Sequence, residues 1–243
     1  MTIVGMPSRM TRTPKRILIV VTSTPRYTSA GYRTGLWLGE LTHFYDVVTD
    51  AGHEVVIASI TGGRVPLDPE SLSTLMLKQG DTGKRYRDRA FMDLLDDTVS
   101  VHDVVGEDFD AIYLTGGHGT MFDFPNNPDL ARLIQRLDAQ GKVVSAVCHG
   151  PAGFLGVRRQ DGTPLLQGRQ VTGFSWPEEK LAGRAKVVPF RLDDRLRGEG
   201  ADYKKALRPL ASNVVVDGRL VTGQNPTSAS GVAKKVVKLL KKG

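Results

Sequence analysis

The chain of 243 residues carries a formal net charge of +7 at pH 7, and 40% of its residues are hydrophobic. That length and apolar content suit one α/β domain with a sizeable core. The single cysteine excludes an intramolecular disulfide, and the apolar run at residues 17–21 is too short for a secretory segment. We therefore expect a reducing, cytoplasmic setting and no membrane association.

The positive charge belongs to the two ends of the chain. Residues 1–16 and 226–243 together hold nine basic residues and no acidic residue. Without these nine, 24 basic and 26 acidic residues remain, so the body of the chain is slightly acidic. A nucleic-acid-binding protein would need a basic face on the body, so we expect no nucleic-acid partner. We interpret residues 1–15 as a disordered basic tail and residues 16–243 as a single domain.

The first half of the chain alternates apolar strands with helices. Continuous apolar runs are typical of parallel strands buried on both faces, and apolar residues at helical spacing indicate helices. We expect strands over 16–23, 53–59 and 110–115 and helices over 35–51 and 85–96. Residues 64–109 are otherwise the least regular part.

The second half continues the alternation. We expect a helix over 128–140, a strand over 143–147, a helix from Pro151, a strand over 168–174 and a short helix from Pro177. Asp217-Gly218 predicts a hairpin joining 213–217 to 219–222, and 226–240 forms a closing helix. This order predicts a mostly parallel sheet with helices on both faces.

Glu40 lies on or beside the apolar stripe of the 35–51 helix, three residues after Trp37 and four before Phe44. Burial would raise the pKa of this carboxyl and let it hold a proton near neutral pH. The alternative is that Glu40 sits at the edge of the stripe and reaches solvent. Spacing alone does not decide between the two.

The strand at 143–147 stops abruptly at Cys148. Gly150 permits a tight turn, and Pro151 suits the first turn of a helix. Strand, sharp turn and helix together predict a nucleophile elbow, and a cysteine at a helix N-terminus has its thiolate favoured by the helix dipole. The alternative is that Cys148 is a small buried hydrophobe at a strand end.

A glycine-rich segment, Gly116-Gly117-His118-Gly119, follows the strand at 110–115. Glycines let backbone N–H groups approach a ligand, so this segment is a candidate second half of an oxyanion hole. On its own the signal is weak. The adjacent acids Glu178 and Glu179 open a predicted helix, where carboxylates suit the positive end of the dipole.

No histidine follows His149, which excludes the chain order of papain-like proteases and of glutaminase domains. The base for Cys148 must be His149 itself or an upstream histidine such as His118. We interpret His53 and His102 as strand-end or surface residues and His43 as a packed helix histidine.

No sequence motif points to a metal or a cofactor. His-x-x-x-His and Cys-x-x-Cys spacings do not occur, so no structural zinc site is predicted. A Walker loop and a Gly-x-Gly-x-x-Gly helix start are also missing from the sequence.

Several ordered motifs together resemble the ThiJ/PfpI superfamily, and within it the heat-shock chaperone and glyoxalase III branch, also called type 1 glutamine amidotransferase-like. The motifs are Thr34-Gly-Leu-Trp-Leu-Gly-Glu40-Leu-Thr-His43, Thr115-Gly-Gly-His-Gly119, Ala146-Val-Cys148-His149-Gly150-Pro151, Val171-Thr-Gly-Phe-Ser-Trp-Pro-Glu-Glu179 and Leu220-Val-Thr-Gly-Gln-Asn-Pro-Thr-Ser-Ala229. Phe44 stands where the branch often has proline.

The resemblance implies a three-layer flavodoxin-like sandwich, usually a homodimer, that acts without a cofactor on a small dicarbonyl substrate. By the same resemblance, Cys148 is the nucleophile, His149 its partner and Glu179, rather than Glu178, the acid of a triad. Glu40 is then the protonated carboxyl near the sulfur. The implied reaction converts methylglyoxal to lactate, with Gly117, His118 and His149 binding the substrate and its oxyanion.

Other functions suit the same residues. The alternatives are a holdase chaperone or protein deglycase-type stress protein and a small cysteine amidase or peptidase. A holdase would need an exposed apolar patch, and an amidase or peptidase would form an acyl-enzyme with amides. A redox sensor would need Cys148 as an exposed thiol of low pKa without a resolving cysteine.

Overall fold

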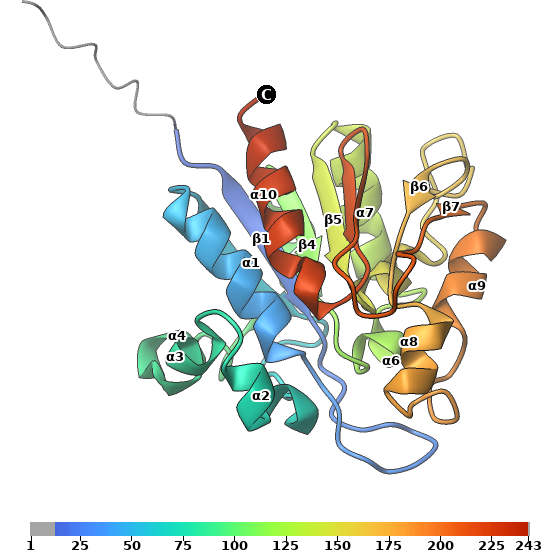
Figure 1. The fold of residues 1–243 in the computed structure, drawn as a ribbon. Coiled ribbons are helices and arrows are strands. Elements are labelled where there is room, and N and C mark those ends of the chain that lie inside the picture. The colour runs from blue at the N-terminus through green and yellow to red at the C-terminus, as the bar shows by residue number, and fades with distance from the viewer. Residues whose placement is uncertain (1–12, 243) are drawn as a thin grey trace, which may run out of the picture.

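The structure is a computed structural model that describes residues 13–242, so residues 1–12 of the predicted basic tail lie outside the described part. A seven-stranded sheet with the strand order β3-β2-β1-β4-β5-β9-β8 forms its centre (Figure 1). Every pair of neighbouring strands is parallel except β8 with β9, which form the predicted hairpin. The strands are β1 Arg16–Val21, β2 Glu54–Ser59, β3 Val99–Ser100, β4 Ala111–Leu114, β5 Val143–Val147, β8 Val214–Asp217 and β9 Leu220–Gly223.

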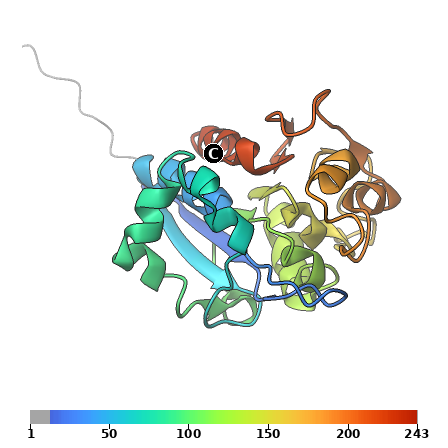
Figure 2. The same ribbon diagram turned by 60° about the horizontal axis from the view of Figure 1, so that its bottom comes forward.

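Helices cover both faces of the sheet, which confirms the predicted layered α/β class. α1 Leu38–Asp50 and α10 Ala229–Leu240 lie side by side over one face (Figure 1). α5 Val101–Val104 and α7 Pro128–Ala139 pack on the opposite face, as the turned view in Figure 2 also shows. Among the helices of residues 13–242, none has the length and apolarity needed to cross a bilayer.

The remaining elements are short and lie mainly beyond the strand ends. They are η1 Pro69–Leu72, α2 Thr74–Leu77, α3 Thr82–Arg87, α4 Arg89–Asp93, α6 Thr120–Asp123, η2 Gly150–Phe154, β6 Gln170–Val171, α8 Trp176–Leu181, α9 Leu192–Gly198, β7 Asp202–Tyr203 and η3 Pro226–Ser228. Figure 1 shows α2 and α8 at the same end of the sheet, the end at which the parallel strands finish. The loops and helices at this end enclose the candidate site.

Two predicted elements are wrong in extent. The helix expected over 85–96 is broken at Asp88, whose extended backbone ends α3 and whose side chain caps α4 by accepting from Phe91 N at 3.4 Å. The strand expected over 168–174 is reduced to β6, which pairs with β7 outside the main sheet. Beyond β6, the N–H of Thr172 donates to Thr222 Oγ1 and that of Phe174 to Cys148 O, so neither joins a ladder.

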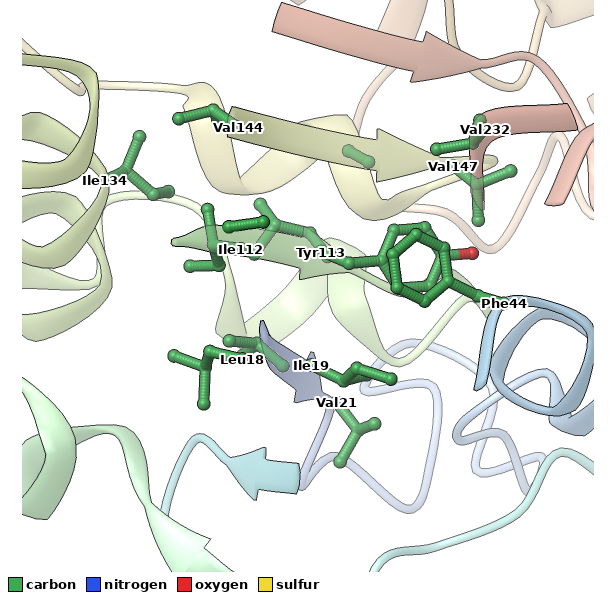
Figure 3. Close-up of a cluster of buried hydrophobic side chains, with 14 of the residues drawn as sticks. Leu18, Ile19, Val21, Phe44, Ile112, Tyr113, Ile134, Val144, Val147 and Val232 are labelled. Atoms are coloured by element: carbon green, nitrogen blue, oxygen red, sulfur yellow. The ribbon is translucent and has the colours of Figure 1, made fainter. Parts of the chain in front are cut away.

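An aromatic pair ties α1 to the sheet beneath the site. The ring of Phe44 lies flat on that of Tyr113, with 3.6 Å between centroids and 5° between planes (Figure 3). The Tyr113 hydroxyl also donates to the backbone oxygen of Glu40 at 3.1 Å. Both rings are fully buried, so this contact fixes the first turns of α1 against β4.

Replacing Phe44 with alanine should lower the free energy of unfolding by about 3–5 kcal/mol, because it removes a fully buried ring and leaves a cavity over Tyr113. Urea denaturation measures the change. The control is Leu207→Ala at a fully exposed position, which should stay within about 0.5 kcal/mol of the wild type. Equal effects of the two changes would contradict the role given to the ring pair.

Candidate active site

Cys148 stands at the carboxyl end of β5, in the turn that follows the strand. Its φ of 57° is in the left-handed region that non-glycine residues rarely adopt, and its N–H donates to Gly223 O at 2.9 Å. Gly150 lets the turn pack closely against the end of β4, because a Cβ there would lie 2.4 Å from Leu114 O. The backbone therefore has the strained strand-to-turn geometry of an elbow.

Two expectations about the Cys148 thiol are wrong. The segment after it is η2, a 3₁₀ helix of five residues, and the side chain is 3% exposed. Burial, and then the charge of Glu40, raise the pKa of the Cys148 thiol well above its usual value, so neither a dipole-stabilised thiolate nor an exposed low-pKa sensor describes the resting sulfur. The proton must leave the sulfur during a reaction, which requires a base.

Glu40 is fully buried in the first turn of α1, so the solvent-exposed alternative is wrong. Its Oε2 accepts a hydrogen bond from Gly116 N at 2.7 Å, and Oε1 has no N–H or O–H partner among the described residues. Burial raises the pKa of Glu40 to about 8, although interaction with Cys148 and the Gly116 N–H opposes the rise. The carboxyl is therefore mainly protonated at neutral pH.

The backbone of Gly116 lies between the side chains of Glu40 and Cys148. A Cβ at this position would lie 2.5 Å from Glu40 Oε2 and 2.8 Å from Cys148 Cβ. The two side chains thus flank one backbone atom, although they are far apart in the sequence. A substitution at Gly116 would push the acid and the sulfur apart.

His149 connects the sulfur to a carboxylate. Its Nδ1 lies 3.3 Å from Cys148 Sγ, and its Nε2 lies 2.9 Å from Glu179 Oε2. His118 Nε2 lies 2.7 Å from the other oxygen, Glu179 Oε1, and the two imidazole rings are 4.2 Å apart. The carboxylate is held between two histidines.

The ionisation of Glu179 fixes the tautomers of both histidines. Burial alone would raise its pKa, but the charge of His149 and hydrogen bonds from His118 and His149 hold the pKa of Glu179 at about 2. An ionised carboxylate only accepts, so each histidine Nε2 carries the proton. Burial and the neighbouring His118 lower the pKa of His149, which leaves its Nδ1 as a bare acceptor facing the thiol.

The side chain of Glu178, unlike that of the adjacent Glu179, makes its hydrogen bonds away from the two histidines. It forms a capping box with Ser175 at the start of α8. Its oxygens also accept from Leu210 N, Gln224 Nε2 and Asn225 Nδ2, each at 2.9 Å. Of the two adjacent acids, only Glu179 faces the histidines.

Gly117 and His149 line the cavity that contains Cys148. The backbone N–H of neither residue donates a hydrogen bond to another described residue. Gly117 has a φ of 98°, and a Cβ there would lie 2.1 Å from Gly35 O, so glycine is required at this turn. Unpaired N–H groups are what an oxyanion hole requires, whereas the His118 ring is occupied by Glu179.

The other histidines lie apart from the sulfur. His43 Nε2 is within 3.1 Å of both Gln79 O and Thr82 Oγ1, as expected for a packed helix histidine. His102 has a side chain that is 73% exposed and lies beside Asp129, and His53 Nδ1 accepts from Lys15 N.

His118, His149 and Glu179 place nitrogen and oxygen atoms within 4.8 Å of one another, a geometry that could hold a metal ion, although no zinc motif is present in the sequence. Each histidine nitrogen points at its own carboxylate oxygen. Hydrogen bonds account for this arrangement without an ion.

Sequence reasoning missed most of the cavity wall. A cavity of about 320 Å³ opens above Cys148, and its lining includes Trp37, Met76, Phe174 and Leu210. The Phe174 ring packs on His149 with 4.6 Å between centroids. Trp37 and Phe174 were in motifs noted for the resemblance, but nothing in their local pattern indicated that they face the sulfur.

Comparison with known proteins places this site in a family. Residues 35–239 match the DJ-1/PfpI family. Glutathione-independent glyoxalase HSP31 of Saccharomyces cerevisiae is 33% identical over 94% of this chain and 99% of its own, and glyoxalase 3 of Candida albicans is 33% identical over 91% and 97%. The chain belongs to the DJ-1/PfpI family, which confirms the resemblance seen in the sequence.

Solved structures of similar proteins support the same family assignment. The Candida albicans glyoxalase III structure superposes with a TM-score of 0.85 at 32% identity, over 92% of this chain and 96% of that one. The 24 kDa rapid encystment protein of Francisella tularensis gives 0.87 at 38% identity, over 93% and 99%. DJ-1beta of Drosophila melanogaster, at 18% identity and 0.59, shows the shared fold alone.

The raised pKa of Glu40 predicts a pH-dependent stability difference from Glu40→Gln. The pKa of Glu40 is about 8 in the folded protein, and its ordinary value is 4.5. At pH values between the two, the folded protein therefore holds a proton that the unfolded chain has lost. The stability of the wild type relative to Glu40→Gln should be fully present below pH 4.5 and should fall by roughly 5 kcal/mol as the pH rises through 8. Urea denaturation across this range measures it.

The control for that experiment is Glu54→Gln, which removes an exposed carboxylate and should give a nearly flat difference. A wild-type stability that rises with pH relative to Glu40→Gln would show that Glu40 is ionised in the folded protein.

Proposed function

We propose that this protein is a glutathione-independent glyoxalase that converts methylglyoxal to lactate without a cofactor. One arrangement carries the proposal: the Cys148 thiol lies between the bare Nδ1 of His149 and the buried, protonated carboxyl of Glu40. A nucleophile, its base and a separate proton carrier thus share one cavity. Similarity to curated glyoxalases over nearly the whole chain supports the same conclusion.

The reaction begins with addition of sulfur to the aldehyde. His149 Nδ1, 3.3 Å from Sγ, takes the thiol proton, and the Glu179 carboxylate stabilises the imidazolium. The sulfur forms a bond to the aldehyde carbon, and the resulting oxyanion accepts hydrogen bonds from the N–H groups of Gly117 and His149. The imidazolium returns its proton to this oxygen, which gives a hemithioacetal.

Glu40 then moves a proton between the two substrate carbons. The carboxyl gives its proton to the ketone oxygen, and the carboxylate that results takes the hydrogen of the former aldehyde carbon, which gives an enediol. Glu40 then returns that hydrogen to the neighbouring carbon and recovers a proton from the hydroxyl group on the former aldehyde carbon. The product is a lactoyl thioester on Cys148. The pKa of about 8 makes the Glu40 carboxylate a stronger base than an ordinary glutamate, while burial keeps the proton from exchanging with solvent.

Hydrolysis completes the cycle. His149 removes a proton from a water molecule, whose oxygen attacks the thioester carbonyl within reach of the same two N–H donors. The carbon–sulfur bond breaks, the sulfur recovers its proton from the imidazolium, and lactate leaves. Methylglyoxal and one water are consumed, so no redox cofactor takes part.

We further infer that residues 16–243 act as one domain within a cytoplasmic homodimer. The continuous sheet and the resemblance to the glyoxalase III branch support this inference. Light scattering by the full chain tests the dimer.

Cys148→Ala should abolish methylglyoxal turnover, and Glu40→Gln should lower kcat by about 10²–10⁴-fold, because a positioned proton carrier contributes that much. Steady-state formation of lactate measures both. His102→Gln, at an exposed position away from the cavity, is the control and should match the wild type. Full activity of both Cys148→Ala and Glu40→Gln would refute the proposed function.

The adjacent acids give a matched pair. Glu179→Gln should lower kcat by about 10²-fold or more, because an amide cannot accept hydrogen bonds from both histidines. Glu178→Gln should lower the free energy of unfolding by about 2–3 kcal/mol, because its amide nitrogen meets donors that the carboxylate accepted. Lactate formation and urea denaturation are measured for both variants. A large loss of turnover in Glu178→Gln, with turnover retained in Glu179→Gln, would show that Glu178 rather than Glu179 supports catalysis.

A further inference from the structure

The cavity above Cys148 is larger than a small oxoaldehyde requires. Its volume of about 320 Å³ corresponds to roughly ten times the ~30 Å³ that a water molecule occupies in the liquid. Apolar side chains form much of its wall: Trp37, Met76, Phe174, Leu181, Leu210 and Pro226. The methyl group of methylglyoxal would cover little of this surface.

Leu210 lies at this cavity in a conformation that leucine rarely adopts. Its φ is 63°, in the left-handed region. Its N–H donates to Glu178 Oε1 at 2.9 Å, and its carbonyl oxygen accepts from Thr227 Oγ1 at 3.2 Å. Two non-local hydrogen bonds therefore hold a strained residue in place, a combination typical of positions that act on a ligand.

Leu181 is the second leucine of the wall. It ends α8, two residues after Glu179, and is 67% exposed, while Leu210 is 49% exposed. Both side chains therefore keep apolar surface in contact with water in the free protein. A ligand that covered them would gain the free energy of removing that surface from water.

The charged side chains of the cavity wall indicate which kind of ligand the cavity can bind. Among the described residues that line the cavity, the ionisable side chains are acids, histidines and Cys148, with no lysine or arginine. Glu70 is ion-paired with Arg184, whereas Glu178 would oppose a phosphate or carboxylate on the ligand. The apolar wall favours an uncharged hydrocarbon group.

We propose that Leu181 and Leu210 form a subsite for the hydrocarbon group on the ketone carbon of 2-oxoaldehydes, so that substrates with butyl or phenyl groups are preferred over methylglyoxal. The inference rests on the proposed function and deepens it. The aldehyde carbon still bonds to Cys148 Sγ and is converted by the steps above, and only the group beyond the ketone changes. The product is the corresponding 2-hydroxy acid.

The test is the dependence of kcat/KM on the substituent, with methylglyoxal, 2-oxohexanal and phenylglyoxal as substrates. The wild type should favour 2-oxohexanal over methylglyoxal by tenfold or more, since even one methylene in a hydrophobic pocket is worth about 10–200-fold. The variant Leu181→Asn/Leu210→Asn should lose most of this preference, because its kcat/KM should fall further for 2-oxohexanal than for methylglyoxal. Asparagine keeps the branched shape and tolerates the positive φ at position 210.

Leu75→Asn is the matched control, because Leu75 is 69% exposed but does not line the cavity. It should keep the wild-type preference. Size-exclusion chromatography and thermal melting of each variant accompany the kinetics. If the leucine variants lose an oligomer that the wild type forms, the leucines belong to a subunit contact and the inference is overturned.

The outcomes separate the two proposals. Turnover of methylglyoxal that depends on Cys148, with no gain along the series or with equal losses for all substrates in the double variant, overturns the subsite and leaves the proposed function intact. Wild-type protein that turns over none of these oxoaldehydes overturns both.

Discussion

The site depends on the unfavourable burial of the Glu40 carboxyl against Cys148. Within residues 13–242 its hydrogen-bond partner is the backbone N–H of Gly116. With a pKa of about 8, this acid keeps its proton at pH 7 at a cost of roughly 3 kcal/mol relative to an unfolded chain in which it would ionise. A negative charge beside the sulfur would oppose the thiolate, so the protonated form is the one compatible with loss of the thiol proton to His149. The surrounding packing must be rigid enough to hold the acid where solvation is poor.

That rigidity comes from the layered fold. β1, β4 and β5 run parallel and end at one edge of the sheet, where the turns after β4 and β5 bring Gly116 and Cys148 together. α1 starts at the same edge and is fixed by the flat contact between Phe44 and Tyr113, which places its first turn over Gly116. The groups to which we assign the reaction thus lie on or next to the main strands and α1, while the wall of the cavity comes from short helices and loops.

Much of this arrangement could be predicted from local pattern. The apolar run 17–21 is fully buried as expected, and the abrupt stop of β5 at Cys148 marked the turn. Helical spacing placed Glu40 near the apolar stripe, but its burial depends on Gly116, 76 residues away, which no local pattern reveals. Sequence order alone also could not separate Glu178 from Glu179.

The regions that resisted prediction are stabilised by distant contacts. The short helices between β2 and β4 rely on pairs such as Arg85 with Asp46, which lies on α1. Their own lengths of four to six residues carry little intrinsic stability. Likewise, the positive φ of Leu210 is set by Glu178, and the expected strand after Gly168 ends where Thr222 captures its backbone.

Hydrogen bonds to the buried Glu178 carboxylate connect three segments of the chain. They are the start of α8, the backbone at Leu210 and the side chains of Gln224 and Asn225. The connection between β7 and β8 that contains Leu210 is also held where Ala206 N donates to Gln224 Oε1 and where Asn225 Nδ2 donates to Ala211 O. A displacement of this connection would therefore be transmitted through Glu178 to the start of α8, the helix that carries Glu179.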